Sequence, residues 1–441
     1  MVSLIFPLNP SIINTETSMT KTLSATPIVP NLKMGVTLLA LELFMNLLPI
    51  KKYTVYRSRL IDCKVTLLFL LFALSVSGQI KVGAEQLDLY LNKIQNKRIG
   101  VVANHTSLIN NSHLVDSLLA LNINVVKVFS PEHGFRGKAD AGEYVDSEKD
   151  KITGLPIISL YGKNKKPYKS QLQDVDVMLF DLQDVGVRFY TYLSTLHYVM
   201  EACAEQNIPL VVLDRPNPNI DRVDGPVLKS KNKSFVGIHP IPVLHGNTLG
   251  EMALMINGEK WLKNEVICDL SVIKVENYTR SSIYKLPIKP SPNLPTYQSI
   301  RLYPSLCFFE GTLISIGRGT DEPFTKYGHP SFRYVMDYSF VPEPNQGAKK
   351  PKLNGKKCFG KNLVDYEVEE GEGLNLSWLM DAYKTYPIKS QFFNNFFRLL
   401  AGDESLKSMI EEGKSEQDIK ASWKTQLEEY KAVREKYLLY N

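Results

Sequence analysis

The sequence predicts an α/β fold whose first domain is built on a parallel sheet. Between residues 98 and 214, short runs rich in β-branched residues alternate with stretches of helical length and spacing. The runs are apolar on consecutive residues, which is typical of strands buried on both faces. Strands of this kind, joined by crossover helices, form right-handed βαβ units, so we expect a Rossmann-like sheet.

The individual elements follow from the same pattern. The expected strands are 98–104, 123–130, 155–160, 175–181 and 208–214, and the expected crossover helices are 111–121 and 190–206. After about Trp261 the apolar runs shorten and proline becomes frequent, and late helices are expected at 376–386 and 416–440. This change predicts a second, smaller α/β domain, with the Rossmann-like domain at 79–262 and the second at 263–441.

The amino-terminal 78 residues have the layout of a targeting segment behind an extension. Three cations in 57–64 precede an uncharged, mostly apolar run at 65–76, which ends in the small residues Ser77 and Gly78. This is the order of a secretory signal, and the run is shorter than the roughly 20 residues of a membrane span. We therefore expect cleavage near Gly78, a periplasmic or secreted protein without stable membrane insertion, and a non-native extension ahead of the signal.

Charge and short motifs exclude several functions. The chain of 441 residues carries a formal charge of +6, but residues 1–78 hold seven Lys and Arg against three Asp and Glu, which leaves +2 for the remainder. This argues against a nucleic-acid partner. The chain has no GxGxxG after the first strand, no phosphate-binding P-loop and no CxxC pair, so we expect neither cofactor nor metal.

Candidate site residues lie where the strands end, because ligands of open parallel sheets bind beyond the carboxyl ends of the strands. Glu132, His133 and Glu143 follow 123–130. The next candidates come with strand 175–181: Asp181 is its last residue, and Asp184, Arg188 and Tyr190 follow it. His245 lies in a later polar loop.

Several of these carboxylates also have structural readings. Asp181 and Asp184 could accept backbone N–H bonds in a turn, and Asp214 could pair with Arg215. We expect Glu251 to complete a helix-capping box with Thr248. Glu132, between Pro131 and His133, suits neither a helix nor a strand, and we interpret it as functional.

A rim of carboxylates with tyrosines and arginines suits glycoside hydrolysis, in which a carboxylic acid protonates the leaving oxygen. An esterase or amidase would need a serine or metal system, and the mature chain contains neither GxSxG nor HExxH. The residues thus favour a secreted hydrolase of a polar, carbohydrate-like substrate.

Long motifs then link the chain to a family. FSPEHGFRGKADAGE (129–143), LFDLQDVGVRFYTY (179–192), PSPNLP (290–295) and YPSLCFFEGTLISIGRGTDEPF (303–324) resemble the NamZ-like family, whose characterised members are exo-β-N-acetylmuramidases. The resemblance runs from about Arg98 to Tyr440. It implies a cleft between the two domains and, as substrates, MurNAc-GlcNAc oligosaccharides of peptidoglycan.

The resemblance also implies site residues. Glu132 matches the catalytic glutamate, and Glu143 and Asp184 are further catalytic candidates. The implied substrate-binding residues are His133, Arg188, Tyr190, Glu310, Arg318 and Thr320, and the strand-end and loop positions add Asp181 and His245 to them. For the lactyl carboxylate of the muramic acid, Arg188 is the first expectation and Arg318 the second.

Two alternatives remain open. A non-catalytic cell-wall glycan-binding protein on the same scaffold would need the arginines and tyrosines but not the carboxylic acid. The retaining or inverting outcome depends on the separation of the carboxyl groups.

The GAKKPKLNGKK stretch at 347–357 is expected to be a solvated basic loop.

Overall fold

The computed structural model describes residues 78–132, 134–136 and 148–441, and Gly78–Asn441 form one compact unit. The extension and signal expected before Gly78 lie outside the described residues, as do His133 and Glu143. Within the described part of the chain, no helix is long and apolar enough to cross a membrane.

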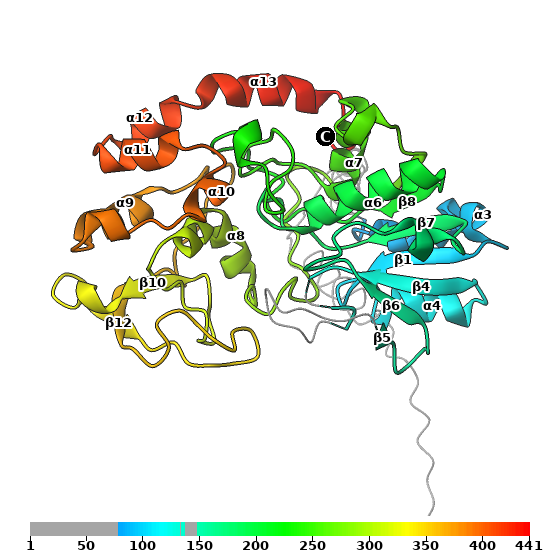
Figure 1. The fold of residues 1–441 in the computed structure, drawn as a ribbon, viewed down its shortest axis with the longest axis horizontal. Helices are drawn as coiled ribbons and strands as arrows, with labels where there is room; N and C mark the ends of the chain where they lie inside the picture. The colour runs from blue at the N-terminus through cyan, green and yellow to red at the C-terminus, as the bar shows by residue number, and fades with distance from the viewer. Residues whose placement is uncertain (1–77, 133, 137–147) are drawn as a thin grey trace, which may run out of the picture. The chain divides into compact units, whose positions relative to one another are not determined.

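A seven-stranded sheet forms the centre of the first half (Figure 1). Its order is β5-β6-β4-β1-β7-β8-β9, and only the β5-β6 pair is antiparallel. The strands are β1 (Ile99–Ala103), β4 (Val125–Ser130), β5 (Glu148–Lys149), β6 (Pro156–Ser159), β7 (Val177–Asp181), β8 (Leu210–Leu213) and β9 (Leu270–Ile273). The five expected strands are β1, β4, β6, β7 and β8, so the predicted Rossmann-like parallel sheet is confirmed.

The strands bury both faces, as their continuous apolar runs predict. In β7, Val177 and Leu179 join one hydrophobic core while Met178 and Phe180 join another. Successive side chains of a strand point to opposite faces, so one apolar run supplies both cores. The core that contains Met178 continues without interruption into residues of the carboxyl-terminal half.

Helices complete the layers around this sheet (Figure 1). They are α3 (Leu91–Ile94), α4 (Leu114–Ala120), α5 (Lys169–Leu172), α6 (Tyr192–Gln206) and α7 (Leu249–Gly258). Residues of α3 and α4 belong to one core, and residues of α6 and α7 to the other. The expected capping box at α7 is confirmed, since Thr248 Oγ1 accepts the N–H of Glu251 at 3.2 Å and the Glu251 carboxylate accepts the N–H of Thr248 at 3.0 Å.

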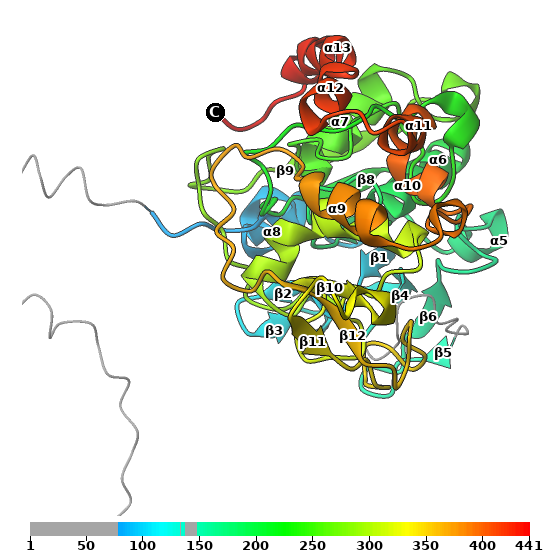
Figure 2. The ribbon, with the colours of Figure 1, turned by 90° about the vertical axis from the view of Figure 1, so that its left-hand side faces the viewer.

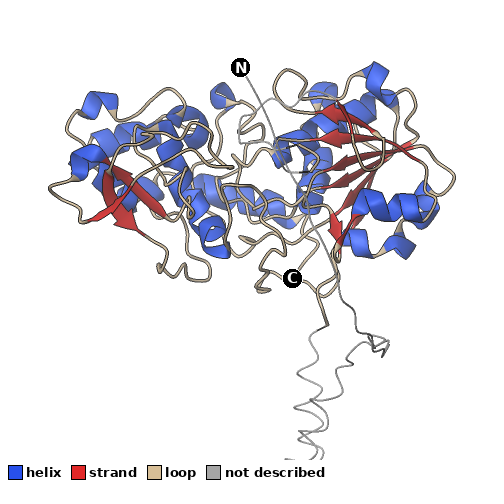
Figure 3. Cartoon of the chain, turned by 90° about the horizontal axis from the view of Figure 1, so that it is seen from below, coloured by secondary structure: helices blue, strands red, loops and turns tan. Residues whose placement is uncertain are grey.

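The second half contains a smaller antiparallel sheet, β10 (Lys326–His329), β12 (Cys358–Asn362) and β11 (Tyr338–Phe340), in that order. Figure 3 shows it as a group of strands separate from the large sheet. The helices of this half are α8 (Tyr297–Leu306), α9 (Ser377–Thr385), α10 (Phe397–Ala401), α11 (Ser405–Glu411), α12 (Glu416–Ala421) and α13 (Lys424–Glu435). A two-stranded hairpin, β2 (Leu108–Ile109) and β3 (Ser112–His113), follows β1.

Two expectations about this half need correction. The large sheet takes β9 from beyond residue 262, so it extends past the predicted domain boundary. The single helix expected at 416–440 is two helices, α12 and α13, separated at Trp423. Trp423 is buried and donates its indole N–H to Asp224 at 2.9 Å, a tertiary contact that a helical pattern cannot reveal.

The carboxyl terminus returns to the large sheet. Figures 1 and 2 show α13 beside α7, and Tyr437 donates its hydroxyl group to Glu259 at 2.7 Å. Tyr440 donates to the buried carboxylate of Asp214 at 2.6 Å, directly after strand β8. The last residues of the chain therefore close one end of the sheet layer.

Candidate active site

A pocket of about 570 Å³ lies beyond the carboxyl ends of the sheet strands. The chain order of the parallel strands reverses between β1 and β7, and crevices at such switch points are the usual ligand sites of open α/β sheets. The lining residues come from both halves of the chain: Glu132, Tyr161, Gly162, Lys165, Phe189, Tyr190, Thr191, Tyr192, Phe235, Val236, Ser291, Asn293, Leu294, Tyr303, Cys307, Glu310, Arg318, Phe324, Phe396 and Leu400.

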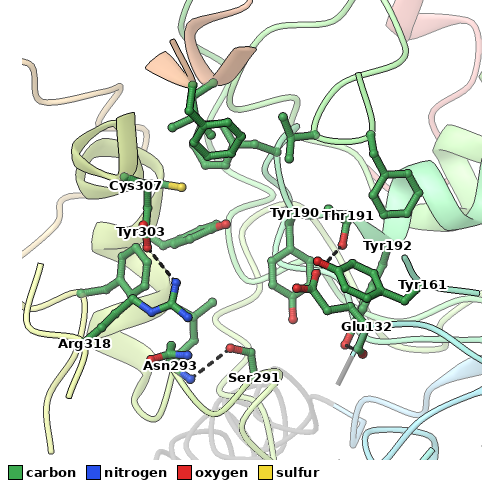
Figure 4. Close-up of a pocket in the computed structure, with 18 of the residues that line it drawn as sticks. Glu132, Tyr161, Tyr190, Thr191, Tyr192, Ser291, Asn293, Tyr303, Cys307 and Arg318 are labelled. Carbon is green, nitrogen blue, oxygen red and sulfur yellow. Dashed lines mark hydrogen bonds and ion pairs between the residues drawn. The ribbon is translucent and has the colours of Figure 1, made fainter. Parts of the chain in front are cut away.

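Glu132 presents its carboxylate to this pocket directly after β4 (Figure 4). The backbone turns just beyond it, because Gly134 has φ 75° and donates its N–H to the carbonyl oxygen of Pro131 at 3.2 Å. Arg136 then anchors the loop through ion pairs with Asp116 at 3.1 Å and Asp150 at 2.8 Å. The functional interpretation of Glu132 therefore agrees with its position.

Two hydroxyl groups hold the Glu132 carboxylate. Thr191 Oγ1, at the N-cap of α6, donates to Oε2 at 3.1 Å. Tyr161 also makes a side-chain hydrogen bond to Glu132, and burial together with the charge of Glu132 raises the pKa of Tyr161. The Tyr161 phenol consequently remains a protonated donor at neutral pH. Figure 4 shows these three residues together on one side of the pocket.

Tyrosines from both halves of the chain line the pocket. Tyr190 donates its hydroxyl group to the carbonyl oxygen of Pro290 at 2.9 Å. Its ring lies edge-on to Tyr192, with centroids 4.8 Å apart, and to Tyr303 at 6.1 Å. Tyr190 was expected at the site, and the structure places it there.

A cationic group faces Glu132 across the pocket in Figure 4. Arg318 Nη1 pairs with Glu310 Oε1 at 2.9 Å, and both side chains line the pocket, as expected. Behind them, Lys352 donates Nζ to the carbonyl oxygens of Phe309 at 3.1 Å and Thr312 at 2.6 Å. Burial lowers the pKa of Lys352. Lys352 was expected in a solvated loop, but here its ammonium group is hydrogen-bonded to two backbone carbonyl oxygens near Glu310.

Arg188 does not line this pocket, contrary to expectation. It is 1% exposed, and its guanidinium group donates to four carbonyl oxygens, those of Pro226, Ile241, Leu400 and Ala401, at 2.7–2.9 Å. These bonds occupy both terminal nitrogens of the group. Arg188 therefore ties segments of the two halves together, and its remaining donor, Nε, is buried without a hydrogen-bond partner.

Asp184 and His245 are buried together and are not among the residues that line the pocket. Asp184 Oδ2 accepts the N–H of Gly186 at 2.7 Å and lies 3.9 Å from His245 Nε2. Burial raises the pKa of Asp184 to about 7 and lowers that of His245 to about 3. The catalytic role expected of Asp184 and the binding role expected of His245 stay predictions, and in the structure Asp184 shapes the turn that leads to the pocket-lining residues 189–192.

Two further expected residues also make structural contacts. Asp181 is fully buried in a two-point ion pair with Arg215, at 2.5 and 2.9 Å. Asp214, the other partner considered for Arg215, instead accepts hydrogen bonds at the start of α7 and from Tyr440. Thr320 donates its hydroxyl group to the carbonyl oxygen of Gly317 at 2.7 Å and does not line the pocket.

The sequence reasoning missed other lining residues. Tyr161 follows β6 and so obeys the same strand-end rule that singled out Glu132. Asn293 and Tyr303 lie in the motifs PSPNLP and YPSLCFFEG but were not singled out. Among the described residues, no group of three or more His, Cys, Asp and Glu side chains could hold a metal ion, and the four described cysteines are unpaired.

Comparisons with known proteins agree with this arrangement. The protein-family model for the N-terminal part of exo-beta-N-acetylmuramidase NamZ matches residues 99–298 of this chain. The family model for the C-terminal part matches residues 301–440. Peptidoglycan beta-N-acetylmuramidase NamZ of Bacillus subtilis (strain 168) is 38% identical over 373 residues, which are 80% of this chain and 89% of that protein.

Two solved structures of DUF1343 family proteins from Bacteroides fragilis NCTC 9343 are also similar. One has a TM-score of 0.77 and 48% identity, the other a TM-score of 0.71 and 29% identity. Each match covers 82% of this chain and 99% of the other. The two matched family models and the Bacillus subtilis relative lead to one assignment: the chain belongs to the NamZ family of exo-β-N-acetylmuramidases.

Proposed function

We propose that this protein is an exo-acting β-N-acetylmuramidase, a glycosidase that releases N-acetylmuramic acid from the non-reducing ends of peptidoglycan fragments. The observation that carries the proposal is the Glu132 carboxyl group, held by Tyr161 and Thr191 in a pocket whose opposite wall is cationic. Family membership and the name of the Bacillus subtilis relative support the same reaction.

Glu132 supplies the proton in this mechanism. The acid donates it to the glycosidic oxygen while the bond from that oxygen to the anomeric carbon breaks. Water finally adds to the anomeric carbon and loses a proton, and the carboxylate of Glu132 is protonated again. Tyr161 and Thr191 fix the carboxyl group from two sides, so it does not have to be ordered again in the transition state. Glu143 remains a proposed second carboxylate, and Glu310 is the other carboxylate among the described lining residues.

Arg318 accounts for a muramic rather than a glucosamine ring. Muramic acid differs from glucosamine by a lactyl ether that ends in a carboxylate. Arg318 lines the pocket beside its partner Glu310 and is the arginine of the lining. Arg318 can offer two parallel N–H groups to a carboxylate, a geometry that a lysine lacks.

We further propose a periplasmic or secreted location and a role in cell-wall turnover or recycling. The support is the cationic, then apolar, then small-residue order of residues 57–78. Amino-terminal sequencing of the protein from its native host should begin near Gln79. Recovery of residues 1–60 in the exported protein would contradict the proposed signal.

Replacement of Glu132 tests the enzymatic proposal directly. Glu132→Gln keeps the shape of the side chain but removes the acid, so hydrolysis of MurNAc-β-1,4-GlcNAc should slow by about 10²–10⁴. An aryl muraminide with a good leaving group needs less protonation and should lose less. Glu370→Gln, at an exposed glutamate, is the matched control. A wild-type protein that binds the disaccharide without cleaving it would instead be the non-catalytic glycan-binding alternative.

A further inference from the structure

Phe235 and Val236 occupy an unusual position at the edge of the pocket. They form the tip of a tight turn that Ser234 and Gly237 close with two backbone hydrogen bonds, of 2.9 and 3.0 Å. Turn tips normally carry glycine or small polar residues. Here both tip residues are apolar, both are only partly buried, and both line the pocket. The turn therefore presents apolar surface to the pocket, and Val236 also packs against the hydrophobic core.

This turn lies on the same side of the pocket as Glu132. The ring of Tyr161, whose side chain is hydrogen-bonded to Glu132, has its centroid 6.3 Å from that of Phe235. Arg318 lies on the other side in Figure 4. A general acid protonates the oxygen that leaves with the departing sugar, so that sugar must lie on the side of the acid.

The ring of Phe235 is supported and remains accessible. Tyr198 stacks on it with an interplanar angle of 13° and a centroid distance of 6.3 Å. The ammonium group of Lys165, itself a lining residue, lies 4.7 Å from the ring centroid. No ion pair with a described carboxylate holds Lys165 there, so this flexible side chain can move aside or donate to a sugar hydroxyl group.

We propose that Phe235, flanked by Tyr161 and Lys165, binds the leaving sugar, an N-acetylglucosamine ring that packs the C–H groups of one face on the phenyl ring. The inference rests on the proposed function and adds a second subsite to it. An aromatic ring presents a rigid apolar face, and the neighbouring phenol and ammonium groups can hydrogen-bond the hydroxyl groups at the edge of the sugar. The subsite would favour disaccharide substrates over glycosides with a small leaving group.

The test compares two substrates in one preparation of Phe235→Ala. With MurNAc-β-1,4-GlcNAc, kcat/KM should fall about tenfold relative to wild type. With the methyl β-glycoside of N-acetylmuramic acid, which places no ring at this subsite, it should fall less than about twofold. A reduced folded fraction lowers both values equally and cancels in their ratio. Phe235→Leu keeps apolar volume without the flat face and should shift the ratio in the same direction.

Tyr334→Ala is the matched control, because Tyr334 is 82% exposed and does not line the pocket. It should leave the ratio of the two substrates unchanged. Equal losses of Phe235→Ala on both substrates, or no loss on the disaccharide, would overturn the subsite while leaving the proposed function in place. Failure of the wild-type protein to hydrolyse either glycoside would refute the proposed function and the subsite together.

Discussion

Thr191 Oγ1 lies 3.1 Å from Oε2 of Glu132, and this hydrogen bond joins the first residue before α6 to the loop that follows β4. Two crossover units of the sheet thus meet at one carboxyl group. The sequence places both residues after strands, but the bond between them spans 59 positions. The position of the proposed acid consequently depends on the packing of β4 and β7, which are separated in the sheet by β1.

Removal of this hydroxyl group should slow catalysis without unfolding the protein. Thr191→Val keeps the volume but no longer holds the Glu132 carboxyl group in place, and a hydrogen bond between neutral groups contributes about 0.5–1.5 kcal/mol. We expect kcat on the disaccharide to fall by up to about tenfold with little change in melting temperature. Thr425→Val, at an exposed position of α13, is the control. An unchanged kcat would show that the Thr191 hydroxyl group is not needed to position the carboxyl group.

Arg318 should determine the preference for muramic over glucosamine glycosides. Arg318→Lys keeps the charge near Glu310 but loses the two-point fork. The kcat/KM for an aryl glycoside of N-acetylmuramic acid, divided by that for the same glycoside of N-acetylglucosamine, should therefore decrease by about tenfold. Arg333→Lys, at an exposed arginine, should leave this ratio unchanged. If the ratio also survives in Arg318→Lys, the lactyl carboxylate is held by other donors.

Arg188 should affect stability rather than specificity. A lysine at this position cannot reach all four carbonyl oxygens, and each buried acceptor without a donor costs about 1–3 kcal/mol. We expect Arg188→Lys to lower the free energy of unfolding in urea by about 2–3 kcal/mol. The folded variant should keep the wild-type preference for muramic glycosides. A wild-type urea midpoint together with a loss of the preference for muramic glycosides would show instead that Arg188 binds the substrate.

Asp184 should make the stability of the protein depend on pH. Burial raises its pKa to about 7 in the folded state, above the value of about 3.9 in the unfolded chain. The folded state then binds more protons between these two values, so its stabilising contribution is present at low pH and decreases as pH rises towards 7. The slope from this one group is at most about 1.4 kcal/mol per pH unit.

Urea unfolding of wild type and Asp184→Asn between pH 4.5 and 8 measures this contribution. The amide cannot ionise, yet its oxygen can still accept the N–H of Gly186. The variant should therefore show the smaller loss of stability with rising pH, and the two curves should become parallel above the folded pKa. Asp214, whose pKa burial raises to about 6, contributes equally to both proteins. Parallel curves throughout would mean that Asp184 is already ionised at pH 5.

The sequence by itself determined the elements and one central residue of the site. Consecutive apolar residues identified β7 and β8, the pair Thr248 and Glu251 identified the start of α7, and the strand-end rule identified Glu132. These signals are local, since strand burial, helix capping and the exit of a strand each depend on a few neighbouring residues. They can therefore be recognised without knowledge of the partners.

Only the tertiary structure decided which polar side chains reach the pocket. Arg188 looks like a binding residue in its motif, but the carbonyl oxygens that receive its N–H groups are 38 to 213 positions away. Lys352 looks like part of a solvated loop, yet it donates to carbonyl oxygens near Glu310. A buried charge stays only where polar partners surround it, and those partners come from segments that the chain brings together when it folds.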